Sequence, residues 1–234
     1  MDSEWKINKS RFLDKLDVSD CNFCTTDPNT LSFPKKNKIF YIPNPVDLSF
    51  EKLHNYKKEH FNTDVFFAMS HGVHRGILKK GKYDKRESFI DSLIMKTPDI
   101  RFDLYGMDSK QPVWADNFIN AISQSKMGIN LSQGRPIKYY SSDRLAQLVG
   151  NGLLVLVDKK TQFTDFFTNK EIIFYKNIND LSEKILKYSR DNTERSRIAK
   201  RGRDKYFKYF NSSIVAEYII NKTFGIKKKY YWDK

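Results

Sequence analysis

Short apolar runs alternate with helical patterns over most of this chain, and that alternation constrains the fold more than any other feature. Runs of strand length occur at 64–70, 101–105, 127–131, 153–157 and 172–175. Between and after them, apolar residues recur at helical spacing over 83–95, 114–125, 142–149, 163–167 and 178–190. Strands joined by helical crossovers pair in parallel, because each crossover returns the chain to the same end of the sheet. The sequence therefore predicts an α/β fold, a doubly wound parallel sheet covered by helices on both faces.

The flanking segments predict the domain organisation. Residues 1–38 mix charges with turn formers and read as an amino-terminal extension. A short strand is expected at 38–45, ending in a turn bracketed by prolines. Helices are expected over 193–210 and 213–224, so we place the main domain at 39–224. Residues 225–234 read as a basic, aromatic tail that frays from the domain.

The charge balance predicts an anionic partner. The 42 basic and 28 acidic residues give a formal net charge of +14, which suits nucleic acid, phospholipid or a phosphorylated small molecule. The basic helix expected at 193–210 also has an apolar face, so we interpret it as a solvated surface helix and consider nucleic acid the weaker partner. No apolar stretch reaches membrane-spanning length, and the first 20 residues are too charged for a signal peptide. We expect a cytoplasmic protein, with peripheral contact at the inner membrane surface as a further possibility.

The segment 138–152 carries the strongest functional signal. Lys138, Ser141, Ser142 and Arg144 surround the start of a predicted helix, and a glycine turn and a buried strand follow. The unpaired N–H groups and the positive dipole at a helix N-terminus favour an anion, so these donors predict a phosphate site. The alternative is a solvated basic face.

The loop after the first predicted strand of the main sheet is the second candidate. It contains His71, Gly72, His74, Arg75 and Gly76. Glycines let backbone amides approach a ligand, an arginine can hold a phosphate, and a histidine can transfer a proton near neutral pH. The alternative is a polar loop whose histidines bond to the backbone.

Two further glycines lie in loops at the same predicted edge. Gly106 begins a loop that could form a wall for a flat base, or that is a simple turn, and Gly134 gives a flexible approach beside Lys138. Cys21 and Cys24 form a lone CxxC pair without further zinc ligands, and we expect two reduced thiols. The chain has no P-loop, GxGxxG, nucleophile elbow or Asp-x-Asp motif.

Three of these pieces together resemble the carboxyl-terminal half of GT-B glycosyltransferases, in the group-1-like family that includes the CgeB spore-maturation proteins. IPNPVD at 42–47 is similar to the Ile-Pro-Asn-Gly-Val-Asp stretch that enters the family's second domain. HRG at 74–76 stands where the family has a basic residue and a glycine. The segment 144–152 resembles the family's Arg-x-x-Glu-x-x-x-x-Gly. The resemblance covers about residues 39–224 and implies a Rossmann-like, nucleotide-sugar-binding domain.

What the resemblance implies is glycosyl transfer from a nucleoside-diphosphate sugar of UDP or GDP type, with no tightly bound cofactor and no metal. Arg75, Lys138 and Arg144 would contact the diphosphate, helped by the hydroxyls of Ser141 and Ser142. Gln147 would reach the ribose, although the family usually has a glutamate there, and Tyr139 stands where the broader superfamily has another acid. His71 or His74 would transfer a proton or hold sugar hydroxyls.

The resemblance also leaves the first GT-B domain unaccounted for. Only about 38 residues precede the matching region, too few for a second Rossmann-like unit. Either the chain is a fragment, or a partner chain supplies the first domain, or the protein binds a nucleotide sugar without transfer. The acceptor, whether glycan, lipid or protein, stays open.

Overall fold

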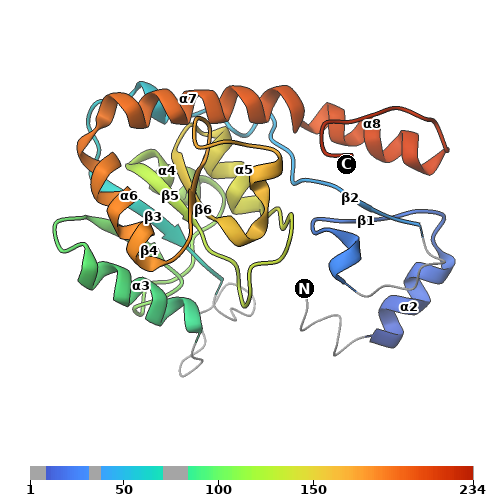
Figure 1. The fold of residues 1–234 in the computed structure, drawn as a ribbon, viewed down its shortest axis with the longest axis horizontal. Helices are drawn as coiled ribbons and strands as arrows, with labels where there is room; N and C mark the ends of the chain where they lie inside the picture. Colours follow the sequence, from blue (N-terminus) through green and yellow to red (C-terminus); the bar gives the residue numbers. More distant parts are fainter. Residues whose placement is uncertain (1–8, 32–37, 71–83, 234) are drawn as a thin grey trace.

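The computed structural model describes residues 9–31, 38–70 and 84–233 (Figure 1). Its strands are β1 (Asn22–Cys24), β2 (Ile39–Tyr41), β3 (Thr63–Ala68), β4 (Phe102–Tyr105), β5 (Ser125–Asn130), β6 (Leu154–Asp158) and β7 (Ile173–Tyr175). Its α-helices are α2 (Lys9–Val18), α3 (Lys85–Lys96), α4 (Ala115–Ser123), α5 (Asp143–Gly150), α6 (Ile178–Arg190), α7 (Asn192–Tyr209) and α8 (Ser212–Thr223).

A five-stranded parallel sheet forms the centre, with strand order β4-β3-β5-β6-β7. After β3 the chain forms β4 on one side of β3, and it then crosses back to form β5 on the other side of β3. The strand order therefore reverses between β3 and β5, and ligands of open parallel sheets bind at such a switch point, beyond the carboxyl ends of the strands.

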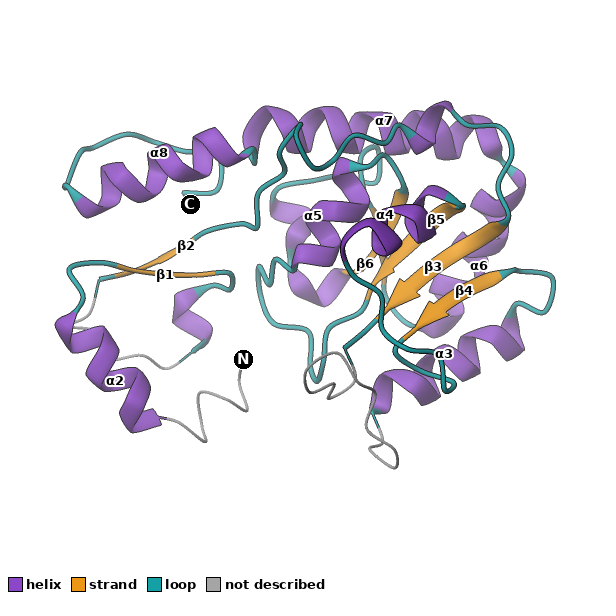
Figure 2. Cartoon of the chain, turned by 180° about the vertical axis from the view of Figure 1, so that it is seen from behind, coloured by secondary structure: helices purple, strands orange, loops and turns teal. Residues whose placement is uncertain are grey.

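Helices cover both faces of this sheet (Figure 2), and the side chains of β3 point alternately into two separate cores. Phe66 and Ala68 belong to the core with α4, α5 and the end of α7, whereas Val65 and Phe67 belong to the core with α3 and α6. All four side chains are buried, because a strand in a covered parallel sheet is apolar on both faces. The predicted doubly wound α/β fold is confirmed.

Local signals explain the helix boundaries. Asp84 and Glu87 form a capping box at the start of α3, and Ser142 caps α5 by accepting a bond from the Leu145 amide at 3.2 Å. The short helix predicted at 163–167 is a 3-10 turn, Phe163–Asp165.

The amino-terminal segment and α8 form a second, smaller layer beside the sheet (Figure 1). Strand β1 pairs in parallel with β2, and the ring of Phe23 packs edge-on against Tyr218 of α8 at 6.2 Å between centroids. Neither α2 nor β1 was expected, because a helix with little apolar periodicity and a three-residue strand give weak signals.

The expectation of a fraying tail is wrong. Tyr230 and Trp232 are buried in the same core as α7 and α8. Trp232 stacks on Phe210 at 5.6 Å, and the Tyr231 hydroxyl donates to the carbonyl of Phe166 at 2.8 Å. Burying these aromatic rings stabilises the end of the chain against the domain. Over the three described ranges, no helix is both long and apolar enough to cross a bilayer.

Candidate nucleotide-sugar site

Arg144 lies at the switch point of the sheet. Its guanidinium donates to the carbonyl of Ala68, the last residue of β3, and at 2.7 Å to the carbonyl of Leu131, just after β5. The same group lies 5.0 Å from the centroid of the Phe67 ring. One arginine from α5 therefore joins the carboxyl ends of the two strands between which the strand order reverses.

The charge of Arg144 has no carboxylate partner within the described ranges. Burial lowers the pKa of its guanidinium to about 10, and the nearby charge of Arg86 contributes. Among the described residues, its buried Nε has no hydrogen-bond partner. A buried cation of this kind is costly unless an anion compensates it. The switch point therefore favours a negatively charged ligand.

The N-terminus of α5 adds to this preference. The Ser142 hydroxyl donates to Asn130 Oδ1 at 2.8 Å while it caps the helix, so the helix start is fixed to the end of β5. The Nδ2 of Asn130 is buried and has no partner in the described part of the chain. The positive end of the α5 dipole and the first amides of the helix thus lie at the same edge of the sheet as the cation of Arg144.

Two predicted site residues, Lys138 and Ser141, bond to other parts of the protein. Lys138 forms an ion pair with Asp27 at 2.8 Å, and its Nζ also lies 4.6 Å from the ring of Tyr139. Ser141 is fully buried, where its hydroxyl accepts the amide of Asn44 at 2.8 Å. Both side chains fasten the loop before α5 to the amino-terminal part of the chain.

The other described candidates differ in their surroundings. Gly106 has φ +77°, and a Cβ there would lie 1.7 Å from the carbonyl oxygen of Met69, so this glycine lets β4 and β3 converge at their ends. Gly134 has the same φ, and a Cβ there would meet no atom of the described residues within 4 Å. Gln147 lies one turn after Arg144 on the same face of α5, half-buried. His71, Gly72, His74, Arg75 and Gly76 lie outside the described residues.

Sequence reasoning missed Arg86 and Tyr175. Arg86 pairs with Asp84 at 2.7 Å and is close enough to lower the pKa of Arg144. The hydroxyl of Tyr175, at the end of β7, is buried without a partner in the described part of the chain, and burial raises its pKa. The polar Asp84-x-x-Glu87 cap could have placed Arg86 at the start of a helix.

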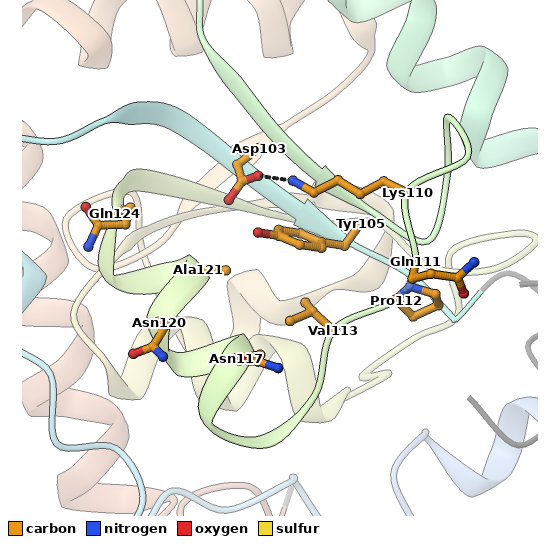
Figure 3. Close-up of a pocket in the computed structure, with 10 residues that line it drawn as sticks. All are labelled: Asp103, Tyr105, Lys110, Gln111, Pro112, Val113, Asn117, Asn120, Ala121 and Gln124. Atoms are coloured by element: carbon orange, nitrogen blue, oxygen red, sulfur yellow. Dashed lines mark hydrogen bonds and ion pairs between the residues drawn. The ribbon is translucent and has the colours of Figure 1, made fainter. Parts of the chain in front are cut away.

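A separate groove of about 550 Å³ runs along the edge strand β4 (Figure 3). Asp103 and Tyr105 of β4 face Asn117 and Asn120 of α4 across it, and Lys110 closes one side. The Lys110 ammonium pairs with Asp103 at 2.7 Å and lies 3.7 Å from the centroid of the Tyr105 ring. None of its lining residues contributes to the edge at Arg144.

Metal and thiol chemistry have little support in the described residues. No group of three or more His, Cys, Asp or Glu side chains gathers there in a way that could hold a metal ion. Cys21 and Cys24 are free thiols, and burial raises the pKa of Cys24 to about 11. A thiol with so high a pKa stays protonated and unreactive near neutral pH.

Comparison with known proteins identifies the family of the chain. Residues 85–221, more than half of the chain, match the family described as glycosyl transferase-like. The chain belongs to that family. A comparison with curated protein sequences finds no match.

Solved glycosyltransferase structures share the fold. A TarM mutant from S. aureus, in complex with fondaparinux, alpha-GlcNAc-glycerol and UDP, is 15% identical, with a TM-score of 0.61 over 92% of this chain and 46% of that one. HepE from Anabaena, in complex with UDP and glucose, is 9% identical, with a TM-score of 0.63 over 91% and 65%. Sucrose-phosphate synthase from Thermosynechococcus elongatus is 11% identical, with a TM-score of 0.59 over 94% and 63%. The chain thus spans roughly half to two thirds of the length of these proteins, and the shared architecture is the GT-B fold.

Proposed function

We propose that this protein transfers a glycosyl group from a nucleoside-diphosphate sugar, and that the donor binds at the carboxyl ends of β3 and β5. We infer that it belongs to the CgeB-like branch of its family. The observation that carries the proposal is the buried guanidinium of Arg144 at the switch point, which has no carboxylate partner in the described ranges.

A diphosphate matches the chemistry of this edge. Its negative charge would compensate Arg144, and its oxygens would accept bonds from the first amides of α5. Arg75, which follows β3 in the sequence, would contact the same group. Lys138 would act indirectly in this scheme, because its ion pair with Asp27 fixes the loop that leads into α5.

The same groups would assist the reaction itself. In transfer, the bond between the anomeric carbon and the diphosphate oxygen breaks while a bond to an acceptor oxygen forms. The departing diphosphate gains charge, which Arg144, Arg75 and the α5 dipole would stabilise. The acceptor hydroxyl loses its proton, and His71 or His74 would receive it. Gln147, on the face of α5 that carries Arg144, would accept a bond from a ribose hydroxyl.

A non-catalytic nucleotide-sugar-binding module is the second candidate. One observation favours it: position 147 is a glutamine, whereas the resemblance implies a glutamate that holds the ribose. An assay of sugar release and transfer separates the candidates, since only the enzyme turns over the donor.

A thermal-shift screen of the purified chain tests donor binding. The nucleotides are UDP, GDP, ADP and CMP with their sugars, each with magnesium and with a chelator. We expect one nucleoside diphosphate to raise the melting temperature equally in both buffers, because protein cations and not a metal hold the phosphates. HepE and the TarM mutant were solved with UDP, which favours the uridine nucleotides. No shift with any nucleotide, in a sample shown to be folded, would overturn the proposal.

A further inference from the structure

An exposed apolar cluster lies at the carboxyl end of α8. Ile220, Phe224 and Ile226 leave 53%, 76% and 55% of their surfaces exposed, although each is large and apolar. Single exposed apolar residues are common on protein surfaces and need no explanation. Three within seven positions of one helix end form a patch, and a patch indicates a contact surface.

The backbone holds this patch in place. Gly225 ends the helix with φ +71°, and the amide of Ile226 bonds to the carbonyl of Asn221 at 2.8 Å. Beyond the patch, Tyr230 is buried and its hydroxyl accepts from Asn221 Nδ2 at 2.6 Å. The exposed stretch 224–229 is therefore fixed at both ends, and its apolar side chains are held outside the core.

Lysines lie beside Ile226. A groove of about 540 Å³ lies between Phe40 of β2, the end of α8 and the tail. Its lysines are Lys38, Lys222, Lys227, Lys228 and Lys229. Lys222 pairs with Asp233 at 2.8 Å and Lys228 pairs with Glu217. The other three have no ion-pair partner in the described part of the chain. We call Ile220, the stretch 224–229 and these lysines the α8 tip.

We propose that the α8 tip docks on an anionic lipid bilayer. Phe224 and Ile226 would enter the interface between headgroups and acyl chains, and the lysines would contact lipid phosphates in and around the groove. Apolar insertion and attraction to anionic headgroups act together in such peripheral binding. A nucleic acid would satisfy the lysines but would leave the apolar side chains in water, so the bilayer fits the tip better.

The position of the α8 tip allows membrane contact without covering the donor edge, our name for the carboxyl ends of β3 and β5 where the donor is proposed to bind. Helix α8 lies beside β1 and β2, at the end of the molecule away from α3 and α6 (Figure 1). The carboxyl ends of β3 and β5 belong to the other layer. A bilayer at the tip would therefore leave the carboxyl ends of β3 and β5 accessible.

Vesicle co-sedimentation of the full chain tests the proposal. The vesicles contain either phosphatidylcholine alone or an equimolar mixture with phosphatidylglycerol. We expect binding to the mixed vesicles and little to phosphatidylcholine. The double variant Phe224→Ser and Ile226→Ser should bind at least about tenfold more weakly, because even partial insertion of two large apolar side chains contributes that much. Lys227→Glu with Lys229→Glu should also bind weakly.

Matched substitutions elsewhere serve as controls. Phe50→Ser removes an apolar side chain with 73% exposure, and Lys52→Glu with Lys96→Glu changes the same number of exposed charges. Both controls should bind like the unaltered chain. Absence of binding to the mixed vesicles would overturn the proposal. Equal vesicle binding by the unaltered chain and by the Phe224 and Ile226 double variant would also overturn it. The same holds if the chain binds a random oligonucleotide more tightly than the mixed vesicles and the double variant binds that oligonucleotide equally well.

Discussion

Arg144 lies six positions after Lys138 but has a different environment. Both are basic residues near the start of α5, and both are predicted from the sequence to hold an anion. Lys138 is neutralised by Asp27, whereas the guanidinium of Arg144 bonds to backbone carbonyls that carry only partial charge. An anionic ligand therefore gains more from Arg144, because the protein itself has already compensated Lys138.

The pair of Asp27 and Lys138 makes a prediction about stability and pH. Burial opposes ionisation of Asp27, but the bonds from Lys138 and Asn29 outweigh it and lower its pKa below 3.8. A carboxyl with a lowered pKa stabilises the folded state above the unfolded pKa, and this stabilisation is lost as the pH falls through the folded value. Asp27→Asn and Lys138→Met should each reduce the free energy of unfolding at neutral pH by about 1 kcal/mol, since Lys138 is partly exposed.

Urea unfolding across a pH series measures this. The Asp27→Asn deficit should shrink as the pH falls below 3.8 and disappear once the folded carboxyl is protonated. Nucleotide affinity of Lys138→Met at neutral pH should fall only slightly, because Lys138 acts on the site only through the loop that its ion pair fixes. A large loss of affinity in that variant would show that Lys138 contacts the ligand after all.

Residue-level predictions from the sequence succeed where the determinant is local. Ser142 was expected at the start of a helix, and it is the cap, because capping depends on neighbours within four positions. The role of Ser141 could not be predicted, since its hydroxyl bonds to Asn44 from a distant part of the chain. The ion pair of Lys138 has the same origin. The positions of His71, His74 and Arg75 stay predictions.

At the scale of elements, the junction of β3 and β4 depends on Gly106. A side chain there would overlap the backbone of Met69, and φ is positive. Gly106→Ala should lower the free energy of unfolding by about 3 kcal/mol or more, because the strand ends must separate. Gly134 has the same φ but open space around it, so Gly134→Ala should cost only about 1 kcal/mol for the left-handed backbone.

Chemical denaturation of the two alanine variants separates sterics from backbone strain. Equal destabilisation would mean that the contact with Met69 is unimportant and that φ alone matters. A smaller effect at Gly106 than at Gly134 would contradict the packing described for the carboxyl ends of β3 and β4.

The strands of the main sheet were predictable because each is an apolar run long enough to be recognised. The run expected at 153–157 became β6, and the run at 172–175 became β7, within a residue or two at each end. Strand β1 was missed because three residues carry no periodicity, and its pairing with β2 is set by tertiary contacts. The tail was predicted to fray because its lysines are typical of solvent-exposed segments. The aromatic residues after the lysines instead pack on Phe210.

At the scale of the whole molecule, one α/β domain carries a smaller layer made from both ends of the chain. Core residues from α7, α8 and the tail join the two layers, with Phe210 in contact with Tyr231 and Trp232. This arrangement puts the donor edge in one layer and the α8 tip in the other. Nucleotide binding and vesicle binding should therefore be separable by mutation.

The central claim is that Arg144 provides the charge that holds a nucleoside diphosphate at the switch point of the sheet. Calorimetric titration of the unaltered chain and of Arg144→Met, with the diphosphate selected by the thermal-shift screen and with a chelator present, tests it most directly. Circular dichroism first confirms that the variant is folded at the titration temperature. The account predicts one site in the unaltered chain and a loss of about 1 to 3 kcal/mol of binding free energy in the variant. Equal affinity in a folded Arg144→Met protein would contradict it.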